Sequence, residues 1–145
     1  MDIRDFLSEE EKQVVVQAIE AAERNTSGEI RVHIENFLEG KDMYKLAVQK
    51  FNKLGMHKTE QRNGVLIFVA VHDHKFAIIG DKGINEKVPD HFWEDTRNIM
   101  AEAFRKGNYA EGLRQGVLHA GEQLKAHFPF KSDDQNELSD EISFG

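Results

Sequence analysis

Gly64-Val65-Leu66-Ile67-Phe68-Val69-Ala70-Val71 decides the fold of this chain, because seven apolar residues follow the glycine without polar alternation. Such a run is typical of a strand that is buried on both faces. The polar residues 72–75 connect it to a second apolar run, Phe76-Ala77-Ile78-Ile79, which Gly80 closes. Two strands joined by so short a connection are predicted to form an antiparallel hairpin.

A helix, a strand and a second helix are predicted before the hairpin. The first helix begins at Ser8, where Ser8-Glu9-Glu10-Glu11 has the spacing of a capping box. Over residues 30–35 apolar and polar side chains alternate, which predicts a strand with one buried face at the periphery of the sheet. The second helix is expected over residues 42–54, with Gly55 at its end.

Two further helices are predicted after the hairpin. Pro89 suits the first turn of a third helix that ends at Gly107. A fourth helix is expected to begin at Asn108. Gly112 and Gly116 lack side chains on this last helix, so they predict close approach of a neighbouring helix.

The order of these elements places the chain in the α/β class. We expect a three-layer α/β/α sandwich, with a mixed central sheet flanked by about four helices. The first and second strands are joined through a helix and should be parallel, whereas the third should run antiparallel to the second. A single domain is expected over residues 1–131, followed by an acidic, flexible tail over residues 132–145, in which a stretch at Leu138 or Ile142 could dock.

Composition excludes several classes of protein. The chain has 145 residues and contains no cysteine, which excludes disulfide scaffolds, thiolate zinc sites and cysteine nucleophiles. The formal net charge is −7, so nucleic acid is not an expected partner. No apolar run resembles a signal peptide or is long enough for a membrane segment. We therefore expect a cytoplasmic protein.

Three loops are expected to meet at one rim of the sheet, because strand connectivity brings residues 27–29, 62–64 and 80–86 together. Their side chains supply oxygen ligands, which are typical of calcium sites, with magnesium as a second candidate. The same residue types are common in solvated turns, which is the alternative interpretation. The candidate ligands are Glu29, Asn63, Asp81, Asn85 and Glu86.

A second candidate metal site lies at the opposite rim. His72 and His74 alternate in the connection between the hairpin strands, with Asp73 between them and Glu35 nearby by strand geometry. Alternate residues of an extended segment share a face, so a metal site with nitrogen ligands is one interpretation. A polar turn is the other.

Four segments of the chain carry a resemblance to a known family. They are residues 26–32 (TSGEIRV), 62–67 (RNGVLI), 80–84 (GDKGI) and 104–113 (FRKGNYAEGL). Together they resemble the TPM domain family over about residues 8–130, which implies an α/β/α sandwich. Some family members are described as acid phosphatases and others as metal-binding or assembly modules. In this resemblance Asp90 matches a family acid and is therefore a further candidate metal ligand, whereas Asn85 stands at a position that is often acidic.

The expected function is binding rather than catalysis, because the sequence contains no nucleophile elbow, Walker loop or zinc-protease helix. We expect a divalent cation, calcium first, bound at the rim of Asp81, in a module that interacts with or assembles a protein partner. The alternative is a metal-dependent acid phosphatase acting on small phosphomonoesters, with the ion between Asp81 and the phosphate.

Overall fold

The computed structural model describes residues 2–130 and 138–145. Within these ranges no helix combines the length and the apolar character that crossing a membrane requires. The helices are α1 (Glu9–Glu23), α2 (Met43–Lys53), α3 (Lys82–Asn85), α4 (Glu94–Arg105) and α5 (Tyr109–Lys125), with 3₁₀ turns η1 (Ile3–Asp5) and η2 (Met56–Lys58). The strands are β1 (Glu29–Glu35), β2 (Gly64–Ala70), β3 (Lys75–Gly80) and β4 (Ser143–Phe144).

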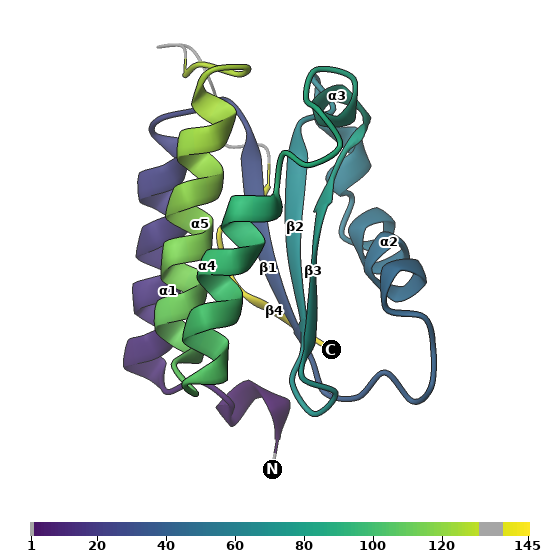
Figure 1. Cartoon of the computed structure of the whole chain (residues 1–145), viewed down its shortest axis with the longest axis vertical. Helices are drawn as coiled ribbons and strands as arrows, with labels where there is room; N and C mark the ends of the chain where they lie inside the picture. The colour runs from purple at the N-terminus through teal and green to yellow at the C-terminus, as the bar shows by residue number, and fades with distance from the viewer. Residues whose placement is uncertain (1, 131–137) are drawn as a thin grey trace.

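The sheet has the strand order β3-β2-β1-β4 and lies between two layers of helices (Figure 1). β1 and β2 are parallel, and β2 and β3 form the antiparallel hairpin that the sequence predicts. Helices α1, α4 and α5 cover one face, and α2 covers the other (Figure 1). The prediction of a three-layer α/β/α sandwich with a mixed sheet is therefore confirmed.

β2 shows why the decisive stretch has no polar alternation. Val65, Ile67 and Val69 belong to the core under α1, α4 and α5. Leu66 and Phe68 belong to a second core under α2. Every residue of β2 is buried, because helices cover both faces of the sheet at this strand.

Local sequence signals predict where α1 begins and that α4 packs closely against α5. The Ser8 side chain accepts from the Glu11 amide and the Glu11 side chain accepts from the Ser8 amide, which is the predicted capping box. A Cβ on Gly112 would lie 2.5 Å from the Phe104 ring, and one on Gly116 would lie 2.5 Å from Met100. Both glycines therefore allow the close helix packing that the sequence indicates.

The third predicted helix is wrong at its start. Residues 89–93 form turns, with Phe92 N–H donating to Pro89 O at 3.1 Å, and α4 begins only at Glu94. This turn places Trp93, which is 7% exposed, in the core before the helix begins. The short helix α3, which the sequence analysis missed, precedes it.

β1 is an interior strand, which corrects the prediction of a peripheral one. The end of the chain returns to the sheet as β4, where Ser143 and Phe144 pair in parallel with His33 and Ile34. Ile142 and Phe144 pack against the main core. Residues 138–145 thus include a docked stretch at Ile142, as the sequence allowed, because partly buried apolar side chains pack against the cores there. The rest of that predicted tail, residues 132–137, lies outside the described residues.

Candidate functional site

The three predicted loops do meet at one rim of the sheet. Glu29 N–H donates to Asn63 O at 3.3 Å, and Asp81 N–H donates to Gly64 O at 2.9 Å. Gly83 N–H donates to Arg62 O at 2.8 Å, so the start of α3 rests directly on the loop before β2. A Cβ on Gly83 would collide with the carbonyl oxygens of Gln61 and Arg62. Strand connectivity therefore predicts the backbone of this rim correctly.

Asp81, the central predicted ligand, faces a cation of the protein itself. Its Oδ2 accepts from Arg62 Nε at 2.8 Å and its Oδ1 accepts from Arg62 Nη2 at 3.0 Å. Oδ1 also accepts from the Lys82 amide at 2.7 Å and so caps α3. Asp81 is buried, and the hydrogen bond that Arg62 donates to its carboxylate raises the pKa of Arg62. A metal ion could use this carboxylate only where Arg62 moves aside.

Asn63 carries an unsatisfied oxygen at the same rim. The residue is only 1% exposed, and its Nδ2 donates to Ser27 Oγ at 3.3 Å. Its Oδ1 is buried and accepts a hydrogen bond from no described residue. A buried acceptor without a partner costs free energy, so it points to a water or a cation as its partner. This orphaned oxygen fits the donor chemistry of a calcium site.

The other predicted ligands do not point at a common position. Glu29 lies against Glu23 of α1, and Asn85 Nδ2 donates to Gly80 O at 3.1 Å. Glu86 and Asp90 are exposed, with Glu86 at 3.9 Å from Lys82 Nζ. Across the described ranges no group of three or more His, Asp and Glu side chains is arranged to hold a metal ion. The backbones of the three loops thus meet at the rim, but their carboxylates point in different directions.

Glu23 is a half-buried residue with a desolvated carboxyl group that the sequence analysis missed. Burial, followed by a hydrogen bond with Asp140 and the nearby Glu29, raises the pKa of Glu23 to about 11, although the Ile30 amide donates to it and opposes the shift. The Ile30 N–H reaches Glu23 Oε2 at 2.9 Å. Glu23 therefore holds a proton at neutral pH. No spacing signal could have found it, because Asp140 reaches it only when the end of the chain docks.

The residues of the second candidate site, Glu35, His72, Asp73 and His74, each contact a different part of the protein. Glu35 Oε2 accepts from His33 at 2.8 Å, and Asp73 Oδ1 accepts from the Leu38 amide at 2.9 Å. His72 stacks on Phe37, with ring centroids 4.3 Å apart. His74 occupies a left-handed turn position with φ 53°. The structure gives each residue its own contact and does not gather the four around one point.

His33 forms the buried link between β1 and β4. Its ring is fully buried and lies between Ser143 Oγ at 2.9 Å and Glu35 Oε2 at 2.8 Å. Burial lowers the pKa of His33, although the hydrogen bond to Glu35 opposes the shift. The alternating pattern of residues 30–35 predicts a solvent-facing position here, so this role could not be read from the strand alone.

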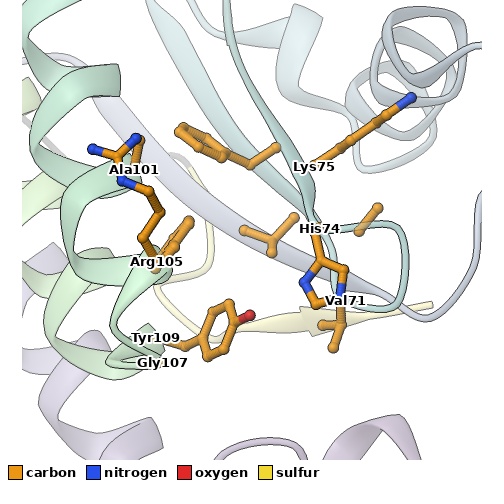
Figure 2. A pocket seen from close by; sticks show the side chains of 11 residues that line it. Val71, His74, Lys75, Ala101, Arg105, Gly107 and Tyr109 are labelled. Atoms are coloured by element: carbon orange, nitrogen blue, oxygen red, sulfur yellow. The ribbon is translucent and has the colours of Figure 1, made fainter.

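A cavity of about 460 Å³ lies between the β2–β3 hairpin and the α4–α5 connection. Its walls are mainly apolar and come from Val69, Val71, Phe76 and Phe104. The Tyr109 hydroxyl extends across the opening toward the His74 ring, whereas the Lys75 side chain points away (Figure 2). No motif in the sequence indicates this cavity, because its walls come from separate elements.

Comparison with protein families identifies the chain. The sequence model of the TPM domain matches residues 1–123. The chain belongs to the TPM domain family. The four segments that resemble this family therefore predicted it correctly, and a comparison with curated protein sequences gave no match.

Solved structures of similar fold extend this assignment of a TPM domain. The BA42 protein from the psychrophilic bacterium Bizionia argentinensis is 48% identical, with a TM-score of 0.92 over 97% of this chain and 96% of that chain. The N-terminal domain of a P. gingivalis protein is 22% identical, with a TM-score of 0.70 over 85% and 79% of the two chains. The N-terminal domain of the cg2496 protein from Corynebacterium glutamicum is 14% identical, with a TM-score of 0.66 over 92% and 84%. The last two support the fold alone.

Proposed function

We propose that this TPM domain binds a divalent cation, calcium first and magnesium second, at the rim where residues 27–29, 61–64 and 81–83 meet. Asp81 supplies the charged ligand and Asn63 a neutral one. The observation that supports this proposal is the Asn63 Oδ1, a buried acceptor without a hydrogen-bond donor among the described residues. A hard cation is a suitable partner for such an oxygen.

Arg62 would act as an internal competitor for the cation. Its guanidinium holds both carboxylate oxygens of Asp81, yet its side chain is 44% exposed. A side chain so accessible can turn into solvent and leave the carboxylate to the ion. Since this exchange gives up an ion pair and orders loop residues, binding should be modest, with a Kd of roughly 10⁻⁴ to 10⁻³ M.

The consequence we propose for the protein is control of a surface for a protein partner. Occupancy would fix the loop before β2 relative to α3, because the proposed ligand Asn63 lies in that loop and the proposed ligand Asp81 caps α3. A rim ordered in this way would present one conformation to a partner and lower the entropy cost of association. Calcium suits irregular loops better than magnesium does, since magnesium requires near-octahedral geometry.

An amide-shift titration tests the cation site. Calcium should shift residues 27–29, 61–64 and 81–83 together, and a chelator should reverse the shifts. Asp81→Asn should weaken the response about tenfold, because it removes the ligand charge. Asp90→Asn is the matched control, since Asp90 is exposed in a separate turn. Equal responses of the two variants, or no saturation at about 10 mM calcium, would contradict the proposal.

An activity assay distinguishes the alternative function, a metal-dependent acid phosphatase, from the proposed cation-binding module. A generic phosphomonoester should show no turnover above buffer between acidic and neutral pH, with or without calcium or magnesium. Turnover that Asp81→Ala abolishes would favour the enzyme over the binding module.

A further inference from the structure

We infer that the cavity between the β2–β3 hairpin and the α4–α5 connection binds a small aromatic carboxylate. This inference is independent of the proposed calcium site, because the cavity lies at the opposite end of β2 and shares no residue with the rim. Its volume of about 460 Å³ falls in the range of small-molecule sites, roughly 300 to 1,000 Å³.

The walls favour a flat, aromatic body. Phe104 meets Phe76 edge to face, with ring centroids 5.1 Å apart and planes at 83°. The Phe104 and Tyr109 centroids are 5.2 Å apart. A ligand ring can continue this cluster, because aromatic rings attract each other in edge-to-face and offset arrangements. Val69 and Val71 provide the aliphatic side of the cavity.

The opening favours an anionic head group. The Tyr109 hydroxyl and the His74 ring face each other there, and both can donate a hydrogen bond to a carboxylate (Figure 2). Arg105 also lines the cavity, and its exposed guanidinium pairs with Glu102 at 2.8 Å. Lys106 Nζ also lies 3.4 Å from Glu102, so two cations share one carboxylate and the excess positive charge on this side of the cavity complements an anion.

His74 is held at the opening by an uncommon backbone conformation. Its φ of 53° lies in the left-handed region, which few residues other than glycine occupy, although asparagine, aspartate and histidine are enriched there. The hairpin turn nevertheless directs the ring toward Tyr109 (Figure 2). Such a conformation is common at ligand sites, because it sets the direction of a side chain that regular strand geometry would not provide.

The probe for this inference is 4-methylbenzoate, compared with 4-methylbenzyl alcohol and with acetate. Amide shifts should saturate at residues 69–76 and 101–109, and the carboxylate should bind at least threefold more tightly than the alcohol. Acetate should bind more weakly still, because it lacks the ring. Equal affinity for the alcohol would overturn the anionic assignment, and equal affinity for acetate would overturn the aromatic one.

Two variants test the position of the ligand. Tyr109→Phe should weaken 4-methylbenzoate binding roughly threefold, because one hydrogen bond is lost. Ala101→Leu should weaken it at least tenfold by filling the cavity. Tyr44→Phe on the exposed face of α2 is the matched control and should change nothing. No saturable shift at about 10 mM probe, or unchanged binding in Tyr109→Phe, would overturn the inference.

Discussion

The two ends of the central sheet differ in how their polar groups are satisfied. At the rim before β2, Asp81 is held by Arg62 and the Asn63 amide donates to Ser27, so most polar groups already have protein partners. At the hairpin end, the cavity has apolar walls, and its hydroxyl and imidazole face the opening. An ion at the rim must replace a side chain, whereas a ligand in the cavity replaces water. The number of polar groups at a site therefore does not by itself indicate how easily a ligand can bind there.

Replacing one glycine at each end of the sheet should give the largest difference in the free energy of unfolding. Gly83→Ala should destabilise the fold by about 2–4 kcal/mol, because the new Cβ would meet the carbonyl oxygens of Gln61 and Arg62. Gly107→Ala should cost only about 1 kcal/mol, since a Cβ there meets nothing within 4 Å and the cost is that of its φ of 78°. Urea denaturation measures both, and equal costs would show that the rim is loosely packed.

Arg62→Ala tests whether the ion pair with Asp81 weakens calcium binding at the rim. The variant removes the internal competitor, so calcium affinity at the rim should rise about threefold to tenfold. Isothermal titration calorimetry measures the change. Arg105→Ala, which removes an exposed arginine at the other end, is the control and should leave calcium binding as it is. Weaker calcium binding in Arg62→Ala would mean that Arg62 organises the site.

Glu23→Gln tests the buried carboxyl beside the start of β1. The pKa of Glu23 is raised from 4.5 to about 11 on folding, so the folded state binds more protons than the unfolded state within that window. The contribution of Glu23 to the free energy of unfolding is fully present below about pH 4.5 and is lost as the pH rises through this window. The free energy of unfolding of the variant should therefore gain steadily on that of the parent between pH 5 and 9, by up to about 1.4 kcal/mol per pH unit. Denaturation curves at several pH values measure it, and a constant difference would contradict the burial.

His33→Gln tests the buried imidazole near the other end of β1, with the smallest expected effect. Because folding lowers the pKa of His33 below 6.5, the unfolded state takes up its proton first, and stability is lost as the pH falls through this range. The variant should lose less stability than the parent between pH 7 and 5, by a few tenths of a kcal/mol. Amide exchange at Ile34 and Gly145 should rise in acid for the parent alone.

The parts of the fold that local signals encode were predictable. Residues 64–70 form a strand buried between two layers of helices, as their unbroken apolar run predicts, and Ser8 caps α1 through residues close to it in sequence. The meeting of the three rim loops also followed, because strand direction and a right-handed crossover constrain where segments end. What failed was the start of α4, since burial of Trp93 overrode the preference of Pro89 for a first helical turn.

The individual contacts of the candidate sites were not predictable. Residue types indicated Asp81 as a ligand but not its pair with Arg62, and Glu23 showed no sign of burial beside Asp140. Both depend on side chains that come together only after the elements pack. The cavity is a similar case, because its lining residues come from two strands, two helices and the turns that follow β2 and α4.

By itself, the sequence determined the class of the fold and the strand directions, because periodicity, caps and turn residues act over a few neighbours, and four segments that resemble the TPM domain indicated its family. Only the tertiary structure decided that β1 is an interior strand, since β4 is two residues long and has no periodicity of its own. It also decided which polar atoms found partners and which, like Asn63 Oδ1, were left without a donor among the described residues. Pairing between distant side chains depends on the packing of whole elements, which no local pattern specifies.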